Sequence, residues 1–220
     1  MLDLFRAIWE IFSADSTYIN GALFAGLLIF AATGEWVAER AGTLNISVEA
    51  MLLAGAFTSA VAYDQTSSVV LGLLAGAFGG MLVASVQAEM SHRLAADQFV
   101  VGLTLNILVF GLTGFLDREL APATKIAATF EVPLLSDLPL IGQALFGQPW
   151  PFYLLYPLIP ISWWLVYRTR WGLEVRAVGE APQPADVSGI KVNLRRRQSI
   201  YYAGITSGMG GAFLIFVQIG

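Results

Sequence analysis

The sequence predicts an all-α protein, a polytopic bundle of about six transmembrane helices that forms one domain over residues 1–220. Hydrophobic residues make up 56% of the 220 residues and charged residues only 13%, whereas a soluble domain carries about 25% charged residues. Apolar runs that approach the roughly 20 residues needed to cross a bilayer recur along the chain. There is no cysteine and a single histidine, His92, so we expect no metal site and no cofactor bound by this chain.

Six apolar runs are candidate spans. They lie at about 18–34, 46–63, 69–89, 98–116, 150–167 and from about 200 onward. The residues before them, 1–16, mix acidic and apolar side chains without the basic start of a signal peptide, and we interpret them as an amphipathic segment at the membrane surface. The last run has no polar flank at its far end, so we expect the chain to be incomplete at its C-terminus.

Lysine and arginine predict the orientation. Seven of the twelve basic residues lie between Arg168 and Arg197, and short loops rich in basic residues stay in the cytoplasm. Alternating backwards from a cytoplasmic loop at 169–199 places the loop at 117–149 outside, together with the N-terminus. Nine basic residues then lie on inside segments and three on outside segments.

Small residues and prolines predict how the helices pack. Glycines recur at four-residue spacing in two of the runs, which predicts close approach of neighbouring helices: Gly72, Gly76 and Gly80 in one, Gly204 and Gly208 in the other. We expect the loop at 117–149 to cover the outer mouth of the bundle, with a short helix at 138–146.

The stretch "LNISVE" (44–49) places polar residues at the edge of the second apolar run. The side chain of Asn45 or Ser47 can cap a helix, and Glu49 then lies in its first turn, where the helix dipole favours negative charge. Alternatively, Glu49 is a functional acid, since ionisable groups inside a membrane are expensive. A third interpretation is a helix broken part-way into the membrane, beside a path for solutes.

Asn106 is a second polar residue in the middle of a span, with Thr104 nearby. An amide at this depth can form a hydrogen bond between helices or contact a polar solute. We therefore name Asn45, Glu49, Thr104 and Asn106 as candidate residues of a substrate path, with the purely structural roles left open.

Three stretches together resemble a known family: "AERAGTLNISVEAMLLAGAF", "ADQFVVGLTLNILVFGLTGFL" and "GLEVRAVGEAPQPADVSGIKVNLRRR". Over roughly residues 18–217 the chain resembles the membrane permease subunit of bacterial ABC importers, in the branch with ribose, branched-chain amino-acid and nucleoside systems. It looks most like the nucleoside and simple-sugar permeases whose binding protein is a basic membrane lipoprotein. The resemblance implies a multi-pass protein of the bacterial inner membrane that is not itself an enzyme.

The resemblance also implies partners: a separate ATPase subunit that uses ATP, a second permease chain and a substrate-binding protein. The sequence agrees, because it contains no G-x-x-x-x-G-K-[ST] loop for binding ATP. In the resembling family, a coupling helix of the cytoplasmic loop docks on the ATPase. Here Pro184 can start a short helix and Gly189 can end it. The candidate coupling residues are Glu180, Pro184, Ala185, Asp186 and Gly189.

Two alternatives stay open at this point. A branched-chain amino-acid permease is the runner-up for the substrate. A secondary transporter driven by an ion gradient is the alternative from a different class. It would require intramembrane ionisable residues, and Glu49 is the candidate, since Glu89 is the last residue of its predicted span.

Overall fold

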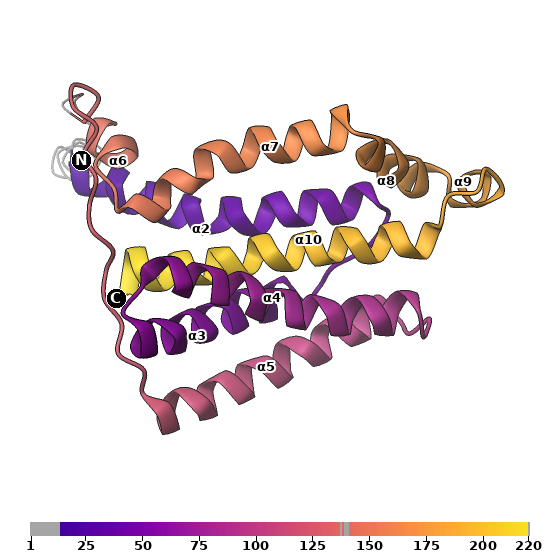
Figure 1. The fold of residues 1–220 in the computed structure, drawn as a ribbon, viewed down its shortest axis with the longest axis horizontal. Helices are drawn as coiled ribbons and strands as arrows, with labels where there is room; N and C mark the ends of the chain where they lie inside the picture. The colour runs from indigo at the N-terminus through magenta and orange to yellow at the C-terminus, as the bar shows by residue number, and fades with distance from the viewer. Residues whose placement is uncertain (1–13, 137, 139–140, 220) are drawn as a thin grey trace, which may run out of the picture.

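The computed structural model describes residues 14–136, 138 and 141–219 as a helical bundle (Figure 1). The long helices are α2 (Asp15–Arg40), α3 (Val48–Thr66), α4 (Val69–His92), α5 (Gln98–Leu120) and α10 (Val192–Phe213), which the π-helical turn η2 (Leu214–Ile219) continues. The shorter elements are α6 (Gly142–Phe146), the 3-10 turn η1 (Trp150–Leu154), α7 (Leu155–Arg168), α8 (Arg170–Glu180) and α9 (Pro182–Val187). The predicted amphipathic segment falls largely on residues 1–13, outside the described residues.

Four helices of the described chain, rather than six, are long and apolar enough to cross a membrane: Asp15–Arg40, Val69–His92, Gln98–Leu120 and Val192–Gln218. The predicted number of spans is therefore wrong. Helix α7 has only 14 residues, about 21 Å of helix, which is short of a hydrocarbon core of about 30 Å. Helix α3 has 19 residues but carries Glu49 in its first turn and Asp64 near its end. Both lie alongside the four spans (Figure 1).

Helix α10 lies at the centre of the bundle, and glycines bring α4 against it. A Cβ atom added at Gly76 would lie 2.7 Å from the Cβ of Ala212, and one added at Gly80 would lie 2.6 Å from the Cα of Gly208. Any larger residue at these positions would push the two helices apart. The predicted close packing of small residues is confirmed. Helix α10 also begins at Val192, well before the predicted start near 200, so that Arg195–Arg197 are helical.

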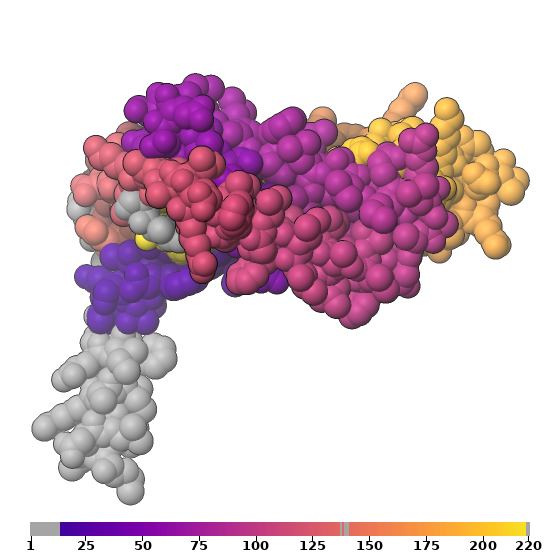
Figure 2. Space-filling view, turned by 90° about the horizontal axis from the view of Figure 1, so that it is seen from below, coloured from indigo at the N-terminus to yellow at the C-terminus, as the bar shows by residue number. Residues whose placement is uncertain are grey.

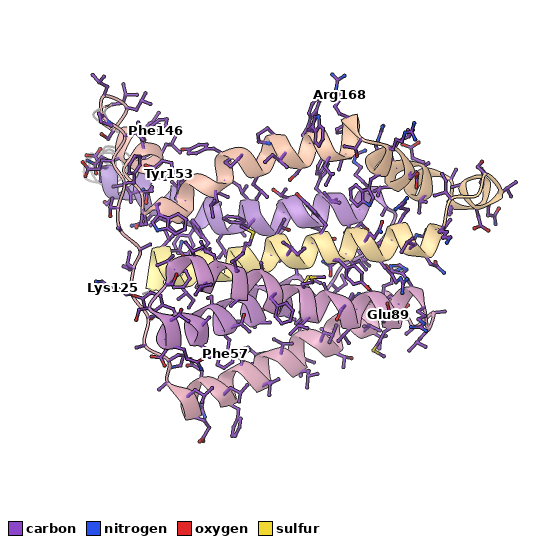
Figure 3. The ribbon with its side chains drawn as sticks, in the orientation of Figure 1. Phe57, Glu89, Lys125, Phe146, Tyr153 and Arg168 are labelled. Carbon is purple, nitrogen blue, oxygen red and sulfur yellow. The ribbon has the colours of Figure 1, made fainter. Side chains whose placement is uncertain are left out.

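The connections gather at two ends of the bundle. The links that follow α2 and α4, together with α8 and α9, lie at the end near Arg168 and Glu89 in Figure 3, which we name the inner end. The segment 121–149 lies at the opposite, outer end, near Lys125 and Tyr153 (Figure 3). This separation agrees with the alternation that the basic residues predict.

The segment 121–149 packs across the outer end, as expected for a loop that covers the mouth. The Ala127 N–H donates to the carbonyl of Phe216 in η2 (2.8 Å), and the Tyr153 hydroxyl donates to the carbonyl of Phe130 (2.6 Å). The short helix predicted at 138–146 is present as α6, over Gly142–Phe146.

Candidate functional site

The chain between α2 and α3 turns back into the bundle. We name residues 41–47 the fold-back segment. Its Ile46 packs on Gly102 of α5, where an added Cβ would lie 2.6 Å from the Ile46 Cβ. Asn106, which contacts the start of α3, lies eight residues after Gln98, about 12 Å along α5. Helix α3 therefore begins inside the bundle, which is the geometry of the broken-helix interpretation.

Irregular backbone at membrane depth needs partners within the protein, and each of the four spans supplies at least one to the fold-back segment. The contacts are Arg196 Nε to the Ala41 carbonyl (3.3 Å), His92 Nε2 to the Thr43 hydroxyl (3.4 Å), Gln98 Oε1 to the Leu44 N–H (2.7 Å), Glu35 to Asn45, and Asn106 Nδ2 to the Ile46 carbonyl (2.9 Å). The segment is therefore held in place by α2, α4, α5 and α10 together.

Asn106 caps helix α3 from a neighbouring helix. Its Nδ2 donates to the Ile46 carbonyl and its Oδ1 accepts from the N–H of Ala50, each at 2.9 Å. Ser47 occupies the N-cap position but makes no side-chain cap hydrogen bond. The prediction that Asn45 or Ser47 caps the helix is therefore wrong, because the first-turn N–H that a local cap would satisfy is already bonded to Asn106.

Asn45 is buried and holds the turn from within. Its Oδ1 accepts from the N–H and the hydroxyl of Ser47, at 3.3 Å and 3.0 Å. Glu35 of α2 bonds both the backbone and the side chain of Asn45. Sequence reasoning missed Glu35 because the predicted first span ended at residue 34. An acid within the last two turns of an otherwise apolar helix is the signal that could have found it.

The four predicted substrate-path residues occupy different environments. Glu49 is exposed at the start of α3, next to Ala50, which Asn106 binds. Thr104 is exposed on the side of α5 opposite Asn106, and its hydroxyl donates to the carbonyl of Val100 in the same helix (2.7 Å). Asn106 therefore bonds the neighbours of both Asn45 and Glu49, whereas Thr104 lies apart from these three residues. A part in solute transport stays a prediction for all four.

At the inner end, α9 is a helix of one and a half turns that projects beyond the bundle (Figure 1). It begins at Pro182, two residues before the predicted start, so that Pro184 lies in its first turn. Gly189 ends it with φ +85°. The N–H of Gly189 bonds the Asp186 carbonyl and that of Ile190 bonds the Ala185 carbonyl, the pair of bonds that defines a Schellman C-cap.

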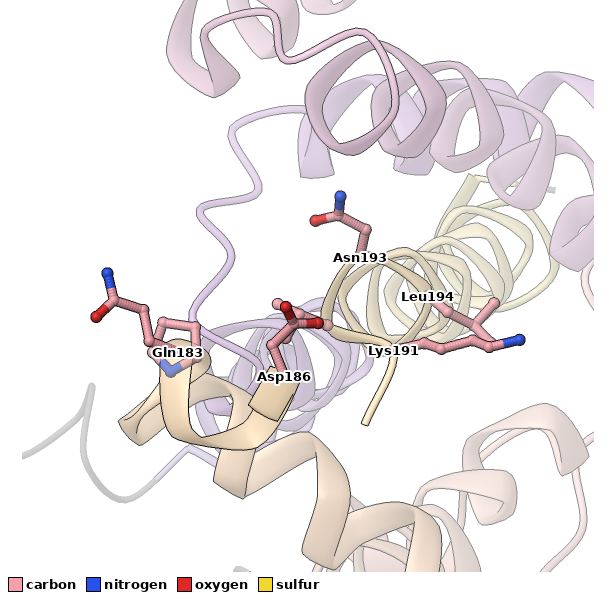
Figure 4. A pocket seen from close by; sticks show the side chains of 7 residues that line it. Gln183, Asp186, Lys191, Asn193 and Leu194 are labelled. Carbon is pink, nitrogen blue, oxygen red and sulfur yellow. The ribbon is translucent and has the colours of Figure 1, made fainter. Parts of the chain in front are cut away.

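The surface of α9 differs from the predicted one at Ala185. That side chain is only 5% exposed and packs within this chain, so it is not available to a partner. Val187, by contrast, is 90% exposed. Between α9 and the start of α10 lies an open cavity of about 570 Å³, with Gln183, Asp186 and Lys191 at its edge (Figure 4).

Helix α8 connects α9 to the fold-back segment. Glu174 of α8 forms an ion pair with Arg195 of α10 (2.6 Å), and the indole N–H of Trp171 donates to Gln198 (2.9 Å). Gly179 lies against the end of α2, where an added Cβ would lie 3.0 Å from the N atom of Gly42. The end of α8 next to α9 therefore packs directly on the residues that begin the fold-back segment.

No group of three or more acidic or histidine side chains that could hold a metal ion occurs among the residues described.

The fold and the site define a multi-pass membrane protein in which helix α3 begins inside the bundle and helix α9 projects from the inner end. Residues 17–220 match the family described as "Branched-chain amino acid transport system / permease component", and the chain belongs to this family. Its members are permeases of the inner (plasma) membrane, not enzymes themselves.

The curated relatives that the chain matches are named as transport proteins. The chain is 34% identical to the nucleoside ABC transporter permease protein NupC of Lactococcus lactis, over 88% of this chain and 65% of the relative. It is 33% identical to the guanosine ABC transporter permease protein NupQ of Bacillus subtilis (86% and 63%). A relative from Haloferax volcanii, named provisionally as a glucose ABC transporter permease, is 34% identical (86% and 59%). The chain thus spans about 60% of the length of these relatives. No solved structure shows a significant match.

Proposed function

We propose that this chain is the transmembrane permease subunit of an ABC importer, and that it forms half of the pore for uptake of a nucleoside or a simple sugar. A separate ATPase subunit supplies the energy, a second permease chain supplies the other wall, and a substrate-binding protein delivers the solute at the outer face. Membership of the permease family and the names of the relatives support this function.

The observation that carries the proposal is the form of α9. A short polar helix with a proline start and a glycine end projects from the inner end, where no lipid-facing role requires it. It exposes the apolar Val187, and the cavity beside it can receive a side chain of a partner (Figure 4). A permease whose sequence lacks an ATP-binding loop needs such an element to receive motion from an ATPase.

The fold-back segment is where this motion would reach the solute. Helix α8 packs on Gly42 and on α10, and the fold-back segment leads directly to Glu49 and to the backbone that Asn106 holds. Broken helices place polar groups at the solute site in other transporter folds. We assign Glu49 and Asn106 to the substrate path, with Asn45 as their structural support; Thr104 lies on the opposite side of α5 and is left out of this assignment.

A second permease chain would cover the outward face of α5. This helix forms a large part of the face seen in Figure 2 and exposes a run of large apolar side chains. Among them are Phe99, Leu103 and Ile107.

The test is association with the ATPase subunit. The variant Val187→Glu places a charge at the most exposed apolar position of α9 and should abolish co-purification of the ATPase with the permease in detergent. The control is Leu134→Glu, which makes the same kind of change at a residue that is 85% exposed at the outer end; the ATPase should be recovered with it at the wild-type ratio. Recovery of the ATPase with Val187→Glu at the wild-type ratio would show that α9 is not the docking element. Because Ala185 is buried, a bulky change there would unseat α9 and could not serve this test.

A further inference from the structure

Helices α3 and α5 separate towards the outer end. Near the inner end, Gly102 of α5 is in tight contact with Ile46, whereas an added Cβ at Gly114, three turns further along, would meet nothing within 4 Å. Figure 1 shows the two helices diverging in this direction. A wedge-shaped space therefore opens outwards between them and closes at the fold-back segment.

A cavity of about 250 Å³ occupies this wedge, which we name the α3–α5 cleft. Its lining residues come from both helices and from η2: Leu53, Ala56, Phe57, Ala60, Phe110, Thr113, Gly114, Asp117 and Ile215. Pockets for drug-sized ligands measure about 300–1,000 Å³. The cleft is therefore of a size for one small solute, with its open side facing away from this chain.

The lining residues form two facing stripes. On α5, Phe110, Thr113 and Asp117 recur at helical spacing on one face, and on α3 Leu53, Phe57 and Ala60 do the same. The cleft is therefore aromatic at Phe57 and Phe110 and polar at Thr113 and Asp117. Phe57 lies between the two helices in Figure 3.

We propose that the α3–α5 cleft binds the solute on its way through the membrane, and that it selects a flat aromatic heterocycle bearing hydroxyl groups, that is, a nucleoside rather than a simple sugar. The base stacks against Phe57 and Phe110, since aromatic side chains offer their faces to any base. The sugar hydroxyls donate to the carboxylate of Asp117 and bond the hydroxyl of Thr113. This inference rests on the proposed function as a permease and narrows its substrate.

Phe110 is suited to this role because it is 68% exposed and free to meet a solute. An apolar aromatic ring needs no partner to face lipid, so exposure alone does not distinguish a solute site from a lipid-facing surface. The polar side chains on the same face of the helix as Phe110 make this distinction. Thr113 and Asp117 lie one and two turns further along the same face of α5, and both line the same cavity as Phe110.

The test compares uptake of tritiated uridine and of labelled glucose by cells expressing the complete importer, with rates normalised to inserted permease. Phe57→Leu and Phe110→Leu keep an apolar side chain and remove the ring. Each should lower the initial rate of uridine uptake at subsaturating concentration about 5- to 10-fold, the size of one lost base–aromatic contact. Phe110→Tyr keeps the ring and should retain the wild-type rate. Phe115→Leu, on a different face of α5 and 60% exposed, should also leave uptake unchanged.

The outcomes separate this inference from the proposed function. Wild-type uridine uptake in both leucine variants would overturn the assignment of the cleft and leave the importer function standing. ATP-dependent uptake of glucose but not of uridine would overturn the proposed selectivity for a nucleoside, and the importer function would again remain intact. Uptake of neither solute with all partners present would overturn the proposed function itself and this inference with it.

Discussion

Replacing Asn106 by leucine tests whether a side chain of α5 holds the break in the membrane helix. Leucine keeps the bulk of asparagine but removes both hydrogen bonds, from Nδ2 to the Ile46 carbonyl and from the Ala50 N–H to Oδ1. The variant should still insert, because the apolar packing of α5 is unchanged, but it should be measurably less stable.

The magnitude follows from the two bonds. Side-chain hydrogen bonds between membrane helices contribute about 0.6 kcal/mol on average and at most about 1.7 kcal/mol. Leaving a buried backbone donor or acceptor unpaired costs about 1–3 kcal/mol. With two backbone groups orphaned in a half-buried site, we expect Asn106→Leu to lower the free energy of unfolding by about 1–3 kcal/mol.

The matched control is Thr104→Val in the same helix. The Thr104 hydroxyl bonds only the carbonyl of its own helix and the side chain is exposed, so this change should stay within about 0.5 kcal/mol of the wild type. Unfolding of the purified protein in nanodiscs can be followed by the fluorescence of its tryptophans. Asn106→Asp, which keeps the acceptor and loses the donor, should fall between the two. Equal stability of Asn106→Leu and Thr104→Val would refute the role of Asn106 as the cap of helix α3.

Two further predictions follow from the same structure. Glu35→Ala removes the carboxylate that holds Asn45 and should lower the free energy of unfolding by about 1–3 kcal/mol. The control Glu39→Ala changes an exposed acid one turn further along α2 and should stay within about 0.5 kcal/mol of the wild type in the same unfolding assay. Similar losses in both variants would contradict the role of Glu35. Because the chain has no cysteine, single introduced cysteines can report which side of the membrane a residue lies on. A membrane-impermeant maleimide added to intact cells should label Leu134→Cys, and it should label Val187→Cys only after the cells are permeabilised. Labelling of both variants in intact cells would overturn the assignment of the inner and outer ends.

Local features of the fold were predictable because their causes are local. Apolar length predicts the four spans, and the four-residue spacing of Gly76, Gly80, Gly204 and Gly208 predicts the packing of α4 on α10. The end of α9 was predictable from Gly189, because a residue with positive φ at a helix C-terminus favours glycine. Hydropathy overcounted the helices that are long enough to cross a membrane, because the apolar run at 150–167 is divided between the 3-10 turn η1 and the 14-residue α7.

The site was less predictable, because its contacts join residues far apart in the sequence. The partners of the fold-back segment lie on α2, α4, α5 and α10, and Asn106 is 56 residues from Ala50. A polar residue such as Asn45 indicates that a break exists, but not which helix satisfies it. Burial of Ala185 could not be foreseen either, because small residues suit an interface with a partner as well as one within the chain.

The most direct test of the central claim is solute uptake by proteoliposomes that contain this permease, its ATPase and its binding protein. The measurement compares vesicles supplied with ATP at the ATPase side with vesicles supplied with a non-hydrolysable analogue, each with and without a protonophore and a sodium gradient. We predict uptake of labelled uridine only with hydrolysable ATP and no effect of collapsing the ion gradients. Uptake that persists with the analogue and stops when the proton or sodium gradient is removed would contradict the account and identify an ion-driven transporter.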